Sequence, residues 1–292
     1  ERNSGKLFGR GLVETTEDFG IMGARPSHPQ LLDWLAVDFM DSGWDYQHLL
    51  RTILSSATYR QAQAVTPGKL EKDPLNVLLT RGPRYRLEAE QIRDLALAAS
   101  GLLVDEIGGP SVRPYQPEGV WEAVAMKGSN TRNYKRDTGE KLYRRSIYTF
   151  HKRTAPHPSM DIFNAPTREV FCVRRERTNT PLQAFVTMND IQFVEAARQL
   201  ATTALQTSAD EAARLEFIYK RLLARPPRDA ERPVLASSLE TFRRAYAAAP
   251  EDAGQLIALG ESPVDSTLDP VELAAWTLLT SQVLNLDETL TK

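Results

Sequence analysis

Glycine and proline residues punctuate the middle of this chain and exclude long helices from it. Between residues 106 and 178 they include Gly108, Gly109, Pro110, Pro114, Pro117, Gly128, Gly139, Pro156, Pro158 and Pro166. On either side, apolar residues recur at the three- and four-residue spacing of amphipathic helices. The sequence therefore predicts a mainly α-helical fold in three parts, 1–105, 106–178 and 179–292. We expect the two helical flanks to pack together as a bundle with the irregular insert over or through them, as one co-folded unit.

Polar residues at helix starts place the individual helices, because they supply acceptors for backbone N–H groups of the first turn. In the N-terminal part, helices are predicted after a capping box at Ser27 and Gln30, after Asp45, from Asp73-Pro74, and over 87–103. In the C-terminal part, they are predicted from Thr180-Pro181, Asp190, Ser208 and Asp269-Pro270, with another near 235–246. Within the insert, the β-branched and aromatic runs 146–150 and 169–173 predict two short strands that pair as a small β element.

The insert is also strongly basic. Between Arg132 and Arg177 there are twelve Lys/Arg and five Asp/Glu, a net charge of +7, although the chain of 292 residues carries −2 in total. The residues outside this segment therefore carry −9. Because local charge determines what a surface attracts, we expect this segment to meet anionic groups.

Composition excludes several classes of protein. With 41% hydrophobic and 25% charged residues, the chain has the make-up of a soluble globular protein. No apolar run approaches the ~20 residues of a membrane span. The single cysteine, Cys172, excludes an internal disulfide, and no metal-binding motif occurs, so no metal site is predicted. A sequence pI near 6.2 without a recognition motif argues against nucleic acid as a partner. Because the sequence begins with Glu1, we expect it to be a processed or excised part of a longer protein.

Basic and aromatic side chains of the insert form the predicted binding site. Guanidinium groups bind carboxylates and sulfates through paired hydrogen bonds, and aromatic rings offer faces to sugars and cations. The predicted ligand-binding residues are Arg144, Arg145, Tyr148, Lys152, Arg153, Arg174, Arg175 and Arg177, with Arg168, Tyr134, Tyr143 and Phe150 as further candidates. The alternative is that these cations pair with the acidic flanks and fix the insert to the helices.

Histidines and carboxylates of the insert are the local set from which acid–base catalysis would be built. The candidate catalytic residues are His151, Asp161 and Glu176, with His157 beside them. The alternative for His151 is a surface position at the end of a strand. On the helix over 87–103, Glu88, Glu90 and Asp94 are expected on a solvated face, paired with Arg86 and Arg93.

Long, ordered motifs run through nearly the whole chain. The strongest reads Arg174-Arg175-Glu176-Arg177-Thr178-Asn179-Thr180-Pro181-Leu182-Gln183-Ala184. Others lie at residues 8–12, 18–20, 28–35, 55–60, 86–94, 108–112, 143–150, 189–190, 274–276 and 284–288. On these residues the chain resembles the C-terminal domain of planctomycete-type cytochrome-associated proteins, a domain of unknown function. It departs from the family pattern over residues 1–6 and at Ile191, where the family tends to have proline.

The resemblance implies a context for the chain. Family members usually carry a secretion signal, a haem-binding cytochrome c module and a second uncharacterised domain ahead of this one. The resemblance therefore implies a periplasmic or cell-surface location and a cytochrome c module or adjacent domain as partner. Haem is expected only in that separate module, and no cofactor is expected in this chain. The family has no assigned catalytic residues, so none is transferred to this sequence.

Two functions remain open from the sequence. The first is a non-catalytic module of a secreted, cytochrome-associated bacterial surface protein, whose basic insert docks an acidic partner domain or an anionic polysaccharide. The second is a carbohydrate-active enzyme acting on uronate- or sulfate-bearing polysaccharide. It requires a deep pocket that gathers His151, Arg145 and Arg175.

Overall fold

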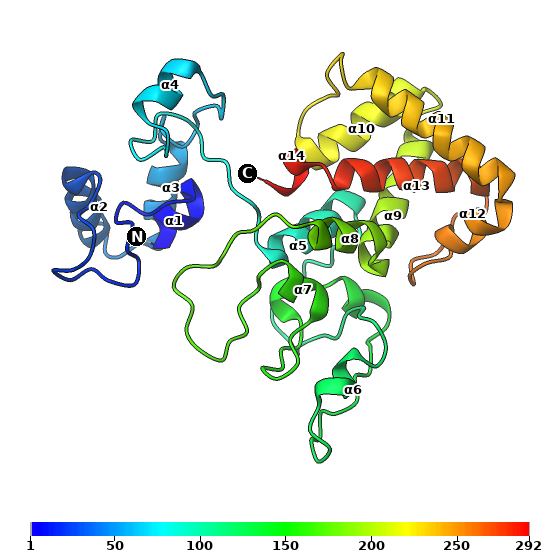
Figure 1. Ribbon diagram of the computed structural model, residues 1–292, viewed down its shortest axis with the longest axis horizontal. Coiled ribbons are helices and arrows are strands. Elements are labelled where there is room, and N and C mark those ends of the chain that lie inside the picture. Colours follow the sequence, from blue (N-terminus) through cyan, green and yellow to red (C-terminus); the bar gives the residue numbers. More distant parts are fainter. Residues whose placement is uncertain (1, 292) are drawn as a thin grey trace. The chain divides into compact units, whose positions relative to one another are not determined.

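The structure, a computed structural model, describes residues 2–291 and contains two compact units. The N-terminal unit comprises residues up to 85 together with 171–175, and the second unit comprises 86–170 and 176–291. Both are built from helices, which confirms the predicted mainly α-helical class. Figure 1 shows the helices and their labels.

The two predicted strands are not formed, and residues 2–291 contain isolated β-bridges but no strand. Ser146–Tyr148 is a turn of 3-10 helix, named η2. The backbone N–H groups of Tyr148 and Thr149 donate back to the carbonyls of Arg145 and Ser146, at 3.0 and 3.1 Å. These donors are therefore unavailable to a β-ladder, and residues 169–173 are irregular.

Four helices form the N-terminal unit: α1 (Arg2–Phe8), α2 (Pro29–Asp41), α3 (Tyr46–Ser55) and α4 (Pro67–Lys72). Asp45 caps α3 as predicted, because its carboxylate accepts from the N–H groups of Gln47 and His48. The helix expected from Asp73-Pro74 is absent. The Asp73 carboxylate instead accepts from the N–H groups of Val77 and Leu78 and closes a turn. The predicted capping box of α2 is also absent, since His28 occupies the cap position and no side chain caps the helix.

The second unit contains ten helices within the described residues. They are α5 (Ala89–Ser100), α6 (Val120–Val124), α7 (Pro158–Ile162), α8 (Pro181–Asn189), α9 (Ile191–Thr207), α10 (Glu211–Leu223), α11 (Arg232–Ala248), α12 (Pro250–Ile257), α13 (Pro270–Leu284) and α14 (Asp287–Leu290). Carboxylates cap α9, α10 and α13 through Asp190, Asp210 and Asp269. The predicted caps at 190 and 269 are confirmed, whereas α10 is capped by Asp210, two residues after the predicted Ser208.

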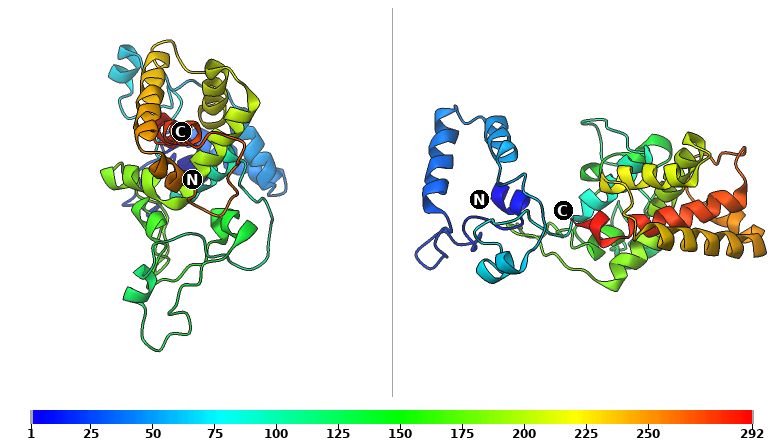
Figure 2. Two further views of the ribbon diagram at one scale, coloured as in Figure 1. Left: turned by 90° about the vertical axis from the view of Figure 1, so that its right-hand side faces the viewer. Right: turned by 90° about the horizontal axis from the view of Figure 1, so that it is seen from above.

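Helix α13 lies at the centre of the second unit's core. It packs against α9, α11 and α12 (Figures 1 and 2). Leu273, Trp276 and Leu279 are each 0% exposed. Because α13 is apolar on all sides, it needs neighbours on all sides, as expected for a fully buried helix. Helix α5 from the N-terminal half of the sequence also packs on α9, so helices from both flanks share this core.

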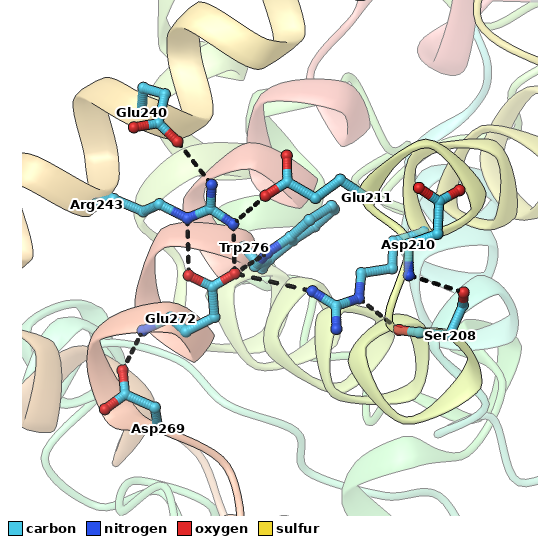
Figure 3. Close-up of polar contacts among 9 residues, drawn as sticks. Ser208, Asp210, Glu211, Glu240, Arg243, Asp269, Glu272 and Trp276 are labelled. Carbon is cyan, nitrogen blue, oxygen red and sulfur yellow. Dashed lines mark hydrogen bonds and ion pairs between the residues drawn. The ribbon is translucent and has the colours of Figure 1, made fainter.

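A polar junction joins three of these helices at the surface (Figure 3). The Arg243 guanidinium of α11 makes two bonds to the Glu272 carboxylate of α13, at 2.6 and 2.7 Å, and one to Glu211 of α10 at 2.6 Å. The indole N–H of Trp276 donates to the same Glu272 carboxylate at 2.7 Å. These bonds to Arg243 lower the pKa of Glu272 and raise the pKa of Arg243. The junction therefore orients α13 beside α10 and α11.

Candidate functional site

Arg144, a predicted ligand-binding residue, lies inside the fold. It is 3% exposed. Its guanidinium donates to the carbonyls of Glu106, at 2.9 Å, of Pro110, at 3.1 Å, and of Gly108. The ring of Tyr148 covers it at 4.0 Å, and the Tyr148 hydroxyl accepts from the N–H of Gly108. Arg144 and Tyr148 therefore fix the 106–110 loop.

Arg93 of α5 binds the backbone of the segment that carries Arg144. It is 2% exposed and donates to the carbonyls of Leu142 and Arg144 at 2.6 and 2.7 Å. Burial lowers the pKa of Arg93 to about 10, against the effect of neighbouring Asp94. Asp94 accepts from the backbone N–H and hydroxyl of Ser146 at 2.7 and 2.6 Å. The expectation of a solvated α5 face is therefore wrong for Arg93, whose buried charge organises the insert.

Three further cations of the insert have partners in the second unit. Arg136 bonds to Glu261 at 2.6 Å, and the half-exposed Arg145 lies 3.8 Å from Asp94. The Lys152 ammonium donates to the Thr131 carbonyl at 3.1 Å and lies 5.1 Å from the centre of the Trp121 ring. Of the predicted set, Arg145 thus matches the alternative in which cations of the insert pair with carboxylates of the flanks, whereas Lys152 contacts other residues of the insert.

The remaining cations of this stretch face solvent. Residues 127–153 contain nine Lys/Arg and two Asp/Glu, a net charge of +7. Five of the nine are exposed and have no carboxylate within ion-pair distance in the described chain: Lys127, Arg132, Lys135, Lys141 and Arg153. We refer to these five as the basic surface. The segment from α6 to residue 135 carries Lys127, Arg132 and Lys135, and it projects from the helices of its unit (Figures 1 and 2). Only Arg153 of the basic surface belongs to the predicted ligand-binding set.

The predicted residues near 175 divide between the two units. Arg174 and Arg175 belong to the N-terminal unit, whereas Glu176 and Arg177 belong to the second. Arg174 and Glu176 are exposed, and Arg175 and Arg177 are partly buried. Each unit therefore holds only part of the predicted set.

A small polar hollow brings together several candidate catalytic residues of the second unit. His151, Asp161, Arg168 and the buried His157 line it, along with Ser146, Thr149 and Glu90. Its free volume is about 10 Å³, at the lower limit for a single water molecule. Arg145 is absent from this lining, so the deep pocket required for a polysaccharide enzyme is not formed here.

The histidines of this hollow are held by hydrogen bonds to the backbone. His151 Nε2 lies 3.1 Å from the Thr167 carbonyl, and His157 Nε2 lies 2.8 Å from the Tyr115 carbonyl. Burial lowers the pKa of His157 to about 4. A neutral His157 must carry its proton on Nε2 to donate to the carbonyl, so Nδ1 accepts from the Ser159 hydroxyl at 3.0 Å. This neutral ring is a structural acceptor and donor at pH 7.

A buried charge network on α9 was not predicted from the sequence. Glu195 and Arg198 are each 1% exposed. The Tyr143 hydroxyl donates to Glu195 at 2.8 Å, and Arg198 donates to the Ser262 carbonyl at 2.8 Å. Burial, followed by Glu195, raises the pKa of Tyr143. The available signal was two charged residues within the mostly apolar 193–201 stretch of α9.

One glycine makes this network possible. Gly260 has a φ of +89°, and a Cβ at this position would overlap the Glu195 carboxylate. Glycine allows both the left-handed backbone and the close approach.

Within residues 2–291, no group of three or more His, Cys, Asp or Glu is arranged to hold a metal ion. No helix in the same range is long and apolar enough to cross a membrane.

The sequence matches the model of one protein family. The family model PSD1, described as a protein of unknown function (DUF1553), matches residues 2–239. The chain belongs to this family. The PSD1 match covers the predicted basic segment and most of both units' helices, and the family description assigns no activity. Neither a curated protein nor a solved structure matches the chain significantly.

Proposed function

We propose that this PSD1 chain is a binding module without catalytic activity of its own, in which the basic surface docks an anionic partner. The partner is an acidic protein domain or an anionic polysaccharide. The protein would belong to a secreted, cytochrome-associated assembly at the cell surface or in the periplasm, with haem in a separate module. This setting rests on the family resemblance.

The supporting observation is the group of five exposed cations without carboxylate partners. Surface charges of one sign attract opposite charges over roughly one Debye length, about 10 Å at 0.1 M salt. Long lysine and arginine side chains on a projecting segment adapt to polyanions without a preformed pocket. By contrast, the buried Arg144 already donates to three carbonyls of the 106–110 loop, and the hollow beside the candidate catalytic residues is small.

Retention on immobilised polyanion tests the proposal. The full chain should be retained on heparin or polygalacturonate at low salt and released at high salt. The double variant Lys135→Gln/Lys141→Gln should elute at clearly lower salt. A matched variant, Lys72→Gln/Arg244→Gln, removes two exposed cations elsewhere and should elute nearly as wild type. Equal shifts for the two variants would refute a dedicated basic surface.

The second candidate is the polysaccharide enzyme: the hollow gathers His151, Asp161 and Arg168, although it lacks the deep pocket that this function requires. In that function His151 would transfer a proton while Arg168 held a uronate or sulfate group. The test is turnover of uronate- and sulfate-bearing polysaccharides by wild type and His151→Ala. Loss of measurable turnover in a folded His151→Ala protein would favour the enzyme over the binding module.

A further inference from the structure

The outer face of α2, in the N-terminal unit, is apolar and exposed. Leu31, Trp34, Val37 and Met40 are 40%, 54%, 50% and 47% exposed. They recur every three residues and so form a ridge that crosses the helix surface at about 45° to its axis. None of the 13 residues of α2 is buried. Exposed apolar clusters of this kind mark interaction sites on soluble proteins.

A pocket opens beside this face. Leu31 and Trp34 of α2, Phe8 of α1 and Ile53 of α3 line it, and apolar atoms form most of its wall. Its free volume is about 150 Å³, and an apolar cavity of about this size holds a benzene molecule. The pocket therefore suits one aromatic or branched aliphatic side chain.

The stretch of sequence that contains α2 is acidic. Residues 11–50 contain seven Asp/Glu and one Lys/Arg, a net charge of −6. On α2, Asp38 lies 3.0 Å from His48, whereas Asp33 and Asp41 are exposed and have no ion-pair partner in the described chain. A ligand that covers the apolar face must therefore carry positive charge at its edges.

We propose that the outer face of α2 and the adjoining pocket form a docking site for a basic amphipathic helix of a partner protein. Apolar residues at three- and four-residue spacing on such a helix pack into the ridges of α2, and one of them enters the pocket. Its lysines or arginines meet Asp33 and Asp41. The acidic surroundings disfavour an anionic membrane, and like charges disfavour the same face of a second copy. This site is separate from the basic surface and does not depend on its role.

A designed peptide provides the probe. A fluorescein-labelled peptide of leucine and lysine at helical spacing is titrated with the full chain, and its scrambled isomer serves as the control. Fluorescence anisotropy should show at least tenfold tighter binding of the amphipathic peptide. Binding should weaken as salt increases, while the preference over the scrambled isomer persists because it comes from apolar burial.

Two pairs of substitutions locate the binding site. Asp33→Lys/Val37→Lys changes exposed residues of α2 and should weaken peptide binding at least tenfold. Asp229→Lys/Val234→Lys makes the same chemical change at exposed positions of the second unit and should stay within twofold of wild type. A second α2 variant, Trp34→Ala, removes a wall of the pocket without changing charge and should weaken binding several-fold. Circular dichroism melting confirms that each variant is folded.

Four outcomes would overturn the proposal. They are equal binding of the two peptides, equal loss in the two double variants, no binding by folded wild type, and a wild-type dimer that Asp33→Lys/Val37→Lys dissociates. Absence of binding would mean that another part of the chain covers the face. A dissociating dimer would assign the face to a second copy.

Discussion

Helix α2 buries none of its 13 residues, whereas α13 in the second unit buries ten of its 15. Both helices are rich in leucine and each carries a tryptophan, so the difference lies in what surrounds them. Trp34 is 54% exposed and Trp276 is 0% exposed. The second unit satisfies its apolar faces with its own helices, while the N-terminal unit leaves the outer face of α2 uncovered within that unit.

The second unit also buries charged side chains. The second unit buries Arg93, Arg144, Glu195 and Arg198 among carbonyls, hydroxyls and one another. Buried charges are costly unless they are paired and hydrogen-bonded, and these charges have such partners. The second unit supplies most of the partners of these buried charges from its own residues, although Arg144 Nε, Arg198 Nε and Glu195 Oε2 accept or donate no hydrogen bond within the described residues. Its free binding capacity lies in the charge of the basic surface. The free capacity of the N-terminal unit lies in apolar surface.

The largest effect is expected from removing a buried arginine. Arg93→Met leaves the Leu142 and Arg144 carbonyls and Gln192 without their donor, and should lower the free energy of unfolding by about 3–5 kcal/mol. Arg81 of the N-terminal unit also bonds two carbonyls, of Asp73 and Pro74, but it is only partly buried. Arg81→Met should therefore cost about 0.5–1.5 kcal/mol. Urea unfolding measures the free energy of unfolding of both variants. Equal losses would contradict the contrast between the buried Arg93 and the partly buried Arg81.

An intermediate effect is expected from acid. The pKa of His157 is about 4 in the folded chain and 6.5 when unfolded. Below pH 6.5 the unfolded chain gains a proton that the folded chain refuses, so the stabilisation is complete above 6.5 and is lost as pH falls to about 4. The loss is on the order of 3 kcal/mol. Besides burial, the positive charge of Arg93 opposes protonation of His157, whereas the bond to the Tyr115 carbonyl favours it.

Substitution isolates this contribution. His157→Gln should flatten the fall in unfolding free energy between pH 6.5 and 4.5 relative to the wild-type chain. Urea titrations at several pH values measure the slope. An NMR titration of His157 with a midpoint near 6.5 would contradict the assignment of a buried, neutral ring.

The smallest effect is expected on the outer face of α2. Val37→Ser removes an apolar side chain that is 50% exposed, and it should change the free energy of unfolding by no more than about 0.5 kcal/mol. Urea unfolding measures this change in the free energy of unfolding. A loss of more than about 2 kcal/mol would mean that Val37 is buried within the folded chain, and the contrast between α2 and α13 would then disappear.

Local sequence signals predicted the longer helices and missed shorter ones such as α4, α6 and α12. Asp45, Asp190 and Asp269 cap helices where the sequence placed them, because a cap depends on residues within one helical turn. The same local logic failed at Asp73, whose carboxylate closes a turn instead of a helix. The run at 146–150 has strand-forming residues, but bonds from Ser146 to Asp94 hold it in a tight turn.

Local sequence signals did not predict which cations of the insert are buried and which are exposed. Arg144 and Arg145 are neighbours in sequence, yet one is 3% exposed and the other is half exposed at the surface. What separates them is contact with the 106–110 loop and with Arg93, residues more than thirty positions away. Composition identified the basic character of the insert. Which charges reach solvent depends on tertiary packing.

The position of α13 has a practical consequence for work on this family. The PSD1 match ends at residue 239, inside α11, whereas α13 occupies Pro270–Leu284. A fragment truncated at that boundary would lack the helix on which α9 and α11 pack, and would expose their apolar sides to water. Such a fragment should aggregate, so the chain to be expressed must extend through α14.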